Sequence, residues 1–228
     1  DKKWFDSSAF KEQYHTDAPL GAVCSKEGTR FELWAPTAQH VWLCLYEQGN
    51  GGEPTEFVEL HKADKGVWSH QDSRNLDGVY YMYDVTVDGV IRRTGDPYAK
   101  ACGVNGERSM VIDLARTDPE GWARDRAPAR QAEDVIYELH VKDFTWDKAG
   151  GVTARNRGKS LGLTETGTTL DGDGTRETGV NYVKRLGVTH VQLLPVYDYG
   201  SVDERHLERP QYNWGYDPVN YNVPEGSY

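Results

Sequence analysis

The sequence predicts two folded parts, an antiparallel β-sandwich followed by a βαβ unit with parallel strands. The sandwich is indicated by short β-rich runs between Arg30 and Arg93, which Gly, Pro, Asn and Asp separate at regular spacing. The βαβ unit is indicated by a strand, a long excursion, a short helix and a second strand within residues 134–195. Charged sequence with Pro119 and Pro128 separates the two parts and marks the domain boundary.

Length, charge and cysteine content exclude several classes of protein. A chain of 228 residues is long enough for two small domains, and its formal net charge is -10. There is therefore no excess of Lys and Arg to neutralise the phosphates of a nucleic acid, and no apolar run approaches the roughly 18 residues of a membrane span. The three cysteines are widely spaced without a CxxC pair, so we expect small buried hydrophobes rather than disulfides or a zinc site. Their thiols are more typical of a reducing compartment, although both a cytoplasmic and a secreted location stay open.

The sandwich is predicted over residues 29–115, after an irregular N-terminal segment of residues 1–28. In its fifth strand, alternate residues from Val79 to Val87 form one almost wholly apolar face, as a sandwich core requires. Asp88 and Gly89 then form a two-residue hairpin turn. The expected strands are Phe31–Ala35, Val41–Tyr46, Glu56–Leu60, Val67–His70, Val79–Val87 and Val90–Arg93, with a further short strand over Met110–Leu114.

Three tryptophans on these strands, Trp34, Trp42 and Trp68, allow two interpretations. Exposed rings would form a flat surface for a glucan, whereas buried rings would belong to the core. Because strand aromatics more often pack in cores, we interpret them as core residues and assign none to a site.

The second part is predicted over residues 134–228, after a linker of residues 116–133. Its elements are a strand Val135–Val141 with Lys142 and Asp143 at its end, a long loop Gly150–Gly179, a helix Val180–Leu186 ended by Gly187, and a strand Val188–Leu194. Asp143, Tyr197 and Asp198 fall beyond the carboxyl ends of the strands, where α/β folds carry functional loops.

Isolated titratable residues in this part give no catalytic or metal assignment. His140 has no second histidine at ligand spacing, so a hydrogen-bonded core histidine is favoured over a metal ligand or general base. Asp171 and Asp173 match the start of a calcium loop, but the closing Glu is missing, which favours a solvated turn. Asp198, Asp203 and Glu204 are interpreted as carboxylates of a solvated loop. No cofactor is expected, and calcium binding stays open.

The stretch Tyr212–Pro218 combines three aromatic residues, an amide and a carboxylate. Gly215 supplies backbone freedom and Pro218 keeps Asp217 out of the helical region, so an ordered non-helical loop is expected. Flat rings beside hydrogen-bonding groups suit a sugar, which offers an apolar face and a rim of hydroxyls. The alternative is that the rings fill the end of a hydrophobic core, and composition favours neither interpretation.

Several of these segments together resemble type I pullulanase, a starch-debranching member of the α-amylase superfamily of glycoside hydrolases. The matching segments are Phe31–Thr37, Asp96–Lys100 with Gly103–Arg108, Ile136–Phe144, Gly187–Pro195 and Tyr212–Pro218. The segment Tyr212–Pro218 is similar to the sequence that distinguishes pullulanases from other members of the superfamily.

The resemblance implies a β-sandwich module of the carbohydrate-binding type, followed by the first two βα units of a (β/α)8 TIM barrel over residues 134–228. It implies the N-terminal portion of a retaining enzyme that cleaves α-1,6-glucosidic bonds in pullulan and amylopectin. The predicted substrate-binding residues are Tyr216, which would stack on a glucose ring, Asp217, which would hydrogen-bond nearby, and Asn213 and Trp214, which would shape the loop.

The resemblance also implies that the catalytic carboxylates come from later barrel strands outside this chain. The expected partners are therefore an α-glucan and the remaining catalytic-domain polypeptide. Two alternatives stay open, a non-catalytic α-glucan-binding module and an interaction subunit that completes the barrel of a partner.

Overall fold

The computed structural model describes residues 2–129 and 133–228, so residues 130–132 of the predicted linker lie outside the described part. The chain divides into two compact units. The first consists of Asp1–Pro119 with Asn220–Val223, and the second of Glu120–Val219 with Pro224–Tyr228. No helix within the described ranges combines the length and apolarity that crossing a membrane requires.

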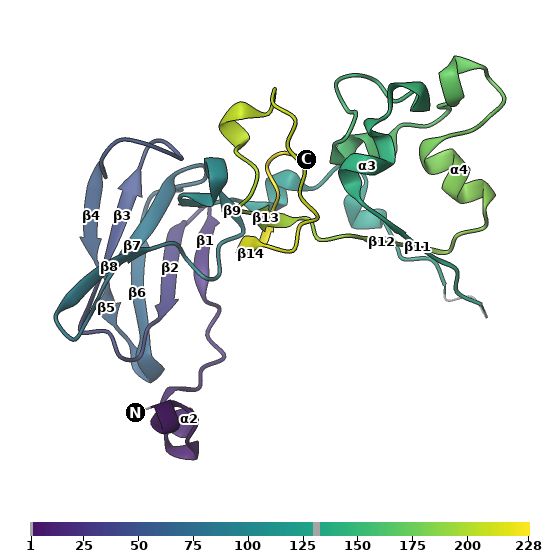
Figure 1. Cartoon of the computed structure of the whole chain (residues 1–228). Coiled ribbons are helices and arrows are strands. Elements are labelled where there is room, and N and C mark those ends of the chain that lie inside the picture. Colours follow the sequence, from purple (N-terminus) through teal and green to yellow (C-terminus); the bar gives the residue numbers. More distant parts are fainter. Residues whose placement is uncertain (1, 130–132) are drawn as a thin grey trace. The chain divides into compact units, whose positions relative to one another are not determined.

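The first unit is a sandwich of two antiparallel sheets (Figure 1). One sheet has the strand order β1-β2-β6-β5, and the other has the order β4-β3-β7-β10-β9 with β8 beside β7. The strands are β1 (Gly21–Ser25), β2 (Gly28–Trp34), β3 (His40–Tyr46), β4 (Glu56–Glu59), β5 (His61–Lys62), β6 (Val67–Asp72), β7 (Tyr80–Val87), β8 (Val90–Thr94), β9 (Ala101–Cys102) and β10 (Ser109–Met110). Single 3-10 turns lie at Asp64–Gly66, Val104–Gly106 and Leu114–Thr117, and a fourth, Trp122–Arg124, begins the second unit.

Inward-facing residues of both sheets form the core, because alternate residues of a strand point to opposite faces. The predicted apolar face of β7 is confirmed, since Tyr81 and Tyr83 are fully buried and Val79 and Val85 pack against them. The hairpin turn is also confirmed, with φ angles of 50° at Asp88 and 75° at Gly89 joining β7 to β8. The other core residues are Phe31, Leu33, Ala38, Val41, Leu43, Leu45, Leu60, Trp68, Leu76 and Val111.

The N-terminal segment is more regular than its sequence pattern predicts. It contains α1 (Lys2–Phe5), α2 (Ser8–Tyr14) and the strand β1. Ser7 caps α2 by accepting a hydrogen bond from the backbone N–H of Phe10 at 3.1 Å, and the Phe10 ring contacts Trp34 edge-on. The segment was predicted to be irregular because its sequence has no hydrophobic period. This prediction was wrong, because helix capping and long-range strand pairing stabilise the helices and the strand.

Two further sequence interpretations need correction in the sandwich. Of the three strand tryptophans only Trp68 is a core residue, whereas Trp34 and Trp42 are each 38% exposed. Only Cys44 is buried, whereas Cys24 and Cys102 are half-buried. Both errors have the same cause. The alternation of residue types along a strand predicts which residues share a face, but it does not show which other part of the chain covers that face.

In the second unit, β11 (Ile136–Leu139) pairs in parallel with β12 (His190–Leu193). Between them lie α3 (Val141–Trp146), 3-10 turns at Lys148–Gly150, Ser160–Thr164 and Leu170–Gly172, and α4 (Gly179–Arg185). The predicted parallel pair and short helix are confirmed, and Gly187 after that helix has φ of 75°. Further along the chain, β13 (Tyr197–Tyr199), a 3-10 turn at Glu204–His206 and β14 (Pro218–Pro224) follow, with β13 paired to β14.

The first predicted strand of this unit is shorter than expected. Lys142 and Asp143 do not end a strand but lie in the first turn of α3. The helix begins there because the His140 side chain accepts a hydrogen bond from the backbone N–H of Asp143 and so caps it. Ile136, Val191 and Leu193 remain exposed in this two-stranded sheet. Whether the pair belongs to a (β/α)8 barrel stays a prediction.

A buried carboxyl group in the sandwich predicts a pH-dependent contribution to stability. Asp96 accepts hydrogen bonds from the Tyr81 hydroxyl and the Tyr98 backbone N–H, both at 2.8 Å, and burial raises its pKa above the usual 3.8. The folded state therefore binds this proton more tightly than the unfolded state, and the resulting stabilisation is lost as pH rises through the folded-state pKa.

We expect Asp96→Asn to gain free energy of unfolding relative to the wild type as pH rises from about 3.8 through the folded-state pKa of Asp96, and the difference should level off above that pKa. Urea unfolding at several pH values measures it, with the exposed Asp88→Asn as control. A difference that does not change with pH, or that changes in the opposite direction, contradicts this account of Asp96.

Candidate functional site

The loop of residues 212–217 is held against the segment that follows β12. Gly215 has φ of +88°, and a Cβ atom placed on it would lie 2.4 Å from the carbonyl oxygen of Pro195. Both the backbone conformation and the close approach therefore require glycine at this position. The loop is ordered and non-helical as predicted, and β14 starts at Pro218.

His140 joins this loop to the junction of β11 and α3. Its Nδ1 accepts the Asp143 N–H at 3.3 Å, so in the neutral ring the proton is on Nε2. Nε2 lies 2.8 Å from the carbonyl oxygen of Asn213, to which it donates, and 3.0 Å from the Tyr228 hydroxyl. The ring is buried, which confirms the expected hydrogen-bonded core histidine.

Asn213 and Ser201 orient the carboxylate of Asp217. The Asn213 side chain accepts the Gly215 N–H at 2.7 Å and donates its own N–H to Asp217 Oδ1 at 2.8 Å. The Ser201 hydroxyl donates to Asp217 Oδ2. These hydrogen bonds, that of Ser201 above all, lower the pKa of Asp217 against the opposing effect of desolvation. Asp217 is consequently an exposed, fixed and negatively charged group at neutral pH.

The aromatic residues of the loop do not fill a hydrophobic core. Tyr212 donates its hydroxyl to Asp143 Oδ2 at 3.0 Å and contacts Trp214 edge-to-face with ring centroids 5.5 Å apart. Trp214 is 58% exposed and Tyr216 is 70% exposed. Since the Tyr216 ring is largely in solvent, the geometry favours the first interpretation of the stretch, a surface for a flat ligand.

The structure thus brings together all four predicted substrate-binding residues, Asn213, Trp214, Tyr216 and Asp217. Sequence reasoning missed the groups that position them, chiefly Ser201 and the carbonyl of Pro195. Their contacts with the loop could not be read from the sequence, because each acts through a single contact with a distant residue. Binding of a substrate by the four residues stays a prediction.

A second group of carboxylates comes from β13, the 3-10 turn Glu204–His206 and the residue after β14. One oxygen each of Asp198, Glu204 and Glu225 lies within 4.8 Å of the others. Asp198 is buried, so the prediction of a solvated loop carboxylate was wrong for this residue. Glu225 accepts the backbone N–H groups of Tyr199 at 3.1 Å and Ser227 at 2.9 Å. These two hydrogen bonds give Glu225 a structural role in joining β13 to the C-terminal segment.

Comparison with known proteins finds a family model that matches the sandwich and pullulanases that match most of the chain. Residues 19–99 match the model of carbohydrate-binding module 48, the isoamylase N-terminal domain. The pullulanase of Bacillus subtilis is 39% identical over 97% of this chain, and pullulanase 1 of Arabidopsis thaliana chloroplasts is 34% identical over 95%. The chain spans 30% and 26% of their lengths. The crystal structure of the Paenibacillus barengoltzii pullulanase in complex with maltohexaose and α-cyclodextrin aligns with a TM-score of 0.91 at 46% identity, over 97% of this chain and 34% of that one.

The first unit is therefore a β-sandwich of the carbohydrate-binding type. Specifically, the chain carries a carbohydrate-binding module 48 and is homologous to pullulanases over about a third of their length. The strand expected over Met110–Leu114 was wrong beyond β10 (Ser109–Met110), because Leu114 begins a 3-10 turn that the Asp113 side chain caps.

The contacts of His140 predict how firmly the loop is held. We expect His140→Ala to lower the free energy of unfolding by roughly 0.5–1.5 kcal/mol for each hydrogen bond lost, here those to the part-buried Asn213 carbonyl and Asp143 N–H. Urea unfolding measures the loss, and hydrogen exchange measures the opening of residues 212–217. The exposed His61→Ala is the control and should change neither. Unchanged exchange in the loop of the His140 variant contradicts the proposed link.

Proposed function

We propose that this chain is the N-terminal portion of a starch-debranching glycoside hydrolase that cleaves α-1,6-glucosidic bonds in pullulan and amylopectin by a retaining mechanism. The observation that carries the proposal is the exposed ring of Tyr216 beside the fixed, negatively charged Asp217. Homology to pullulanases over 97% of the chain supports it.

The chemistry of the reaction explains why these two groups are useful. Retaining hydrolysis passes through a transition state with positive charge on the sugar ring. The face of Tyr216 and the carboxylate of Asp217 both favour such a charge, and the ring also provides an apolar surface for the CH face of glucose. Asn213 keeps the carboxylate in place, and Trp214 borders the same loop.

The nucleophile and the acid/base residue are proposed to belong to the remaining catalytic polypeptide. Retaining enzymes use two carboxyl groups about 5–5.5 Å apart on either side of the scissile bond. In the described part of the chain, the close carboxylate group of Asp198, Glu204 and Glu225 has two buried members, so a glucan would not reach it. In this proposal the parallel pair β11 and β12 provides the first two strands of a (β/α)8 barrel that the remainder completes.

A second function, glucan binding without catalysis, is favoured by one observation on the sandwich. A hollow of about 560 Å³ on its outer face is lined in part by Trp42, Phe57 and Ile91. Polar pairs surround the Trp42 ring, with His40 Nδ1 3.1 Å from Glu59 and Arg93 bound to Asp84 at 2.7 Å. An exposed aromatic ring between hydrogen-bonding groups suits a sugar in the same way as the loop does.

Replacement of Tyr216 tests the debranching proposal. In the complete enzyme we expect Tyr216→Ala to lower kcat/KM for pullulan on the order of 100-fold, which corresponds to about 2.7 kcal/mol of transition-state stabilisation. Its stability should hardly change, because the ring is 70% exposed. The assay is release of reducing ends from pullulan, with Tyr221→Ala as the exposed tyrosine control. Wild-type activity in the Tyr216 variant would remove this residue from the site.

Replacement of Trp42 tests glucan binding by the sandwich. Trp42→Ala should weaken binding of maltohexaose to the chain by about 1–2 kcal/mol, roughly tenfold, because the ring surface is lost. Calorimetry measures the affinity, and Trp122→Ala, an exposed tryptophan outside the module, is the control. Equal affinity in both variants would exclude the outer face as the binding surface.

A further inference from the structure

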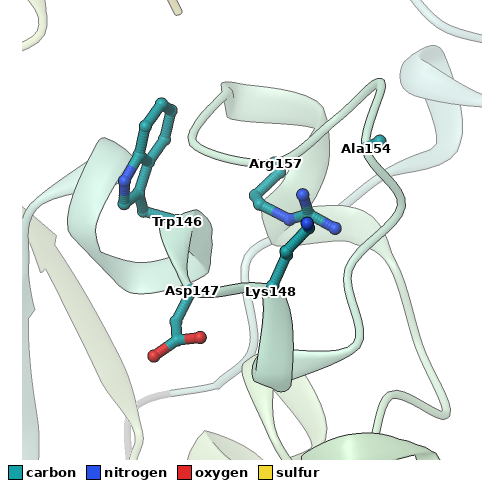
Figure 2. A pocket seen from close by; sticks show the side chains of 5 residues that line it. All are labelled: Trp146, Asp147, Lys148, Ala154 and Arg157. Carbon is teal, nitrogen blue, oxygen red and sulfur yellow. The ribbon is translucent and has the colours of Figure 1, made fainter. Parts of the chain in front are cut away.

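A hollow in the second unit gathers positive charge in an otherwise acidic protein. Its volume is about 490 Å³, and Trp146, Asp147, Lys148, Ala154 and Arg157 line it. Trp146 is the last residue of α3, Lys148 opens the following 3-10 turn, and Arg157 lies on a loop further along the chain (Figure 2). Two cations thus converge from different elements, in a chain whose formal net charge is -10.

The only carboxylate in this lining does not neutralise the two cations. Asp147 Oδ1 accepts the Ala149 N–H at 2.9 Å, and its side chain points away from Lys148 and Arg157 in Figure 2. Among residues 2–129 and 133–228, no carboxylate oxygen lies within 4.0 Å of a side-chain nitrogen of Lys148 or Arg157, the distance that defines an ion pair. By contrast, Arg93 and Arg176 each bind a carboxylate, at 2.7 and 2.5 Å.

Arg157 has an unused hydrogen-bond donor. Its Nη2 donates to the Val152 carbonyl at 3.1 Å, but its Nε is buried without a hydrogen-bond partner in the described structure. Because Nε is buried, the terminal nitrogens of the guanidinium group are the ones that can reach a ligand in the hollow, and such a group matches two oxygens of a phosphate at once. The side chain is therefore suited to an oxyanion.

The loop that carries Arg157 is fixed before any ligand arrives. The Gly158 N–H donates to the buried Thr145 hydroxyl of α3 at 2.7 Å, and Asn156 donates to Glu165 at 2.8 Å. Gly158 has φ of +71°, and a Cβ atom on it would lie 2.8 Å from the Trp146 ring, so the loop passes directly over that ring. A preformed site loses less conformational entropy on binding.

Trp146 adds an apolar surface to the charged one. Its ring is 58% exposed, and Lys142 Nζ lies 4.7 Å from its centroid. Lys142 and Arg157 also line a neighbouring hollow of about 190 Å³ together with Lys159 and Arg209. An aromatic face next to several cations suits a ligand with a sugar ring and a dianionic group.

We propose that this hollow binds the phosphate monoester of a sugar, with Arg157 and Lys148 on the phosphate and Trp146 against the sugar ring. No residue that lines this hollow belongs to the loop of residues 212–217, although the neighbouring hollow extends to Asn213 of that loop. The proposal does not depend on the debranching activity, because binding is measured without hydrolysis.

Calorimetry on the full chain at low ionic strength tests this site with glucose 6-phosphate, inorganic phosphate and glucose. We expect saturable binding of glucose 6-phosphate, weaker binding of inorganic phosphate and none of glucose at this site. Arg157→Gln and Lys148→Gln should each weaken binding of glucose 6-phosphate at least tenfold. Lys184→Gln, which removes the same charge from the exposed end of α4, should weaken it less than twofold.

Two further measurements separate a binding defect from a folding defect and identify the source of the phosphate. Arg157→Lys keeps the charge but loses the planar fork, so its affinity should lie between those of the wild type and Arg157→Gln, with an unchanged thermal midpoint. A maltodextrin carrying phosphate, compared with the same maltodextrin without it, distinguishes a polymer-borne phosphate from a free sugar phosphate. Absence of saturable glucose 6-phosphate binding, or an equal loss in the Lys184 variant, would overturn the proposal.

Discussion

The hydrogen bonds of one buried histidine connect the parts of the candidate site. His140 caps α3 through Nδ1 and holds the carbonyl of Asn213 through Nε2 at 2.8 Å. The two contacts are compatible with a single tautomer, in which Nδ1 accepts and Nε2 donates. The position of the loop of residues 212–217 thus depends on where β11 ends and α3 begins.

The same loop shows how a fold makes a surface that is both rigid and exposed. Its backbone packs against the Pro195 carbonyl and accepts a hydrogen bond from His140. Its polar side chains hydrogen-bond to one another and to Ser201. The ring of Tyr216 consequently faces solvent, and the ring of Trp214 is exposed on one side while it contacts Tyr212 on another. A binding surface built in this way pays little conformational entropy when a flat ligand arrives.

Two kinds of recognition are proposed on different surfaces of the chain. The loop with Tyr216 and Asp217, like the outer face around Trp42, combines aromatic rings with hydrogen-bonding groups and suits neutral glucose units. The hollow around Arg157 adds uncompensated positive charge, which suits a phosphorylated one. In an acidic protein such a local excess of cations is a specific feature, since the overall charge repels anions.

The sequence by itself determined the sandwich, the β7–β8 hairpin, the parallel pair and the grouping of Asn213, Trp214, Tyr216 and Asp217. Each depends on alternation, turn residues or neighbours along the chain, all of which are local. Only the tertiary structure decided that Trp68 is buried while Trp42 is exposed, that Ser201 holds Asp217, and that Lys148 and Arg157 share a hollow. These features depend on which distant segment packs against a residue. Long-range contacts of this kind produce no periodic pattern of residue types in the sequence.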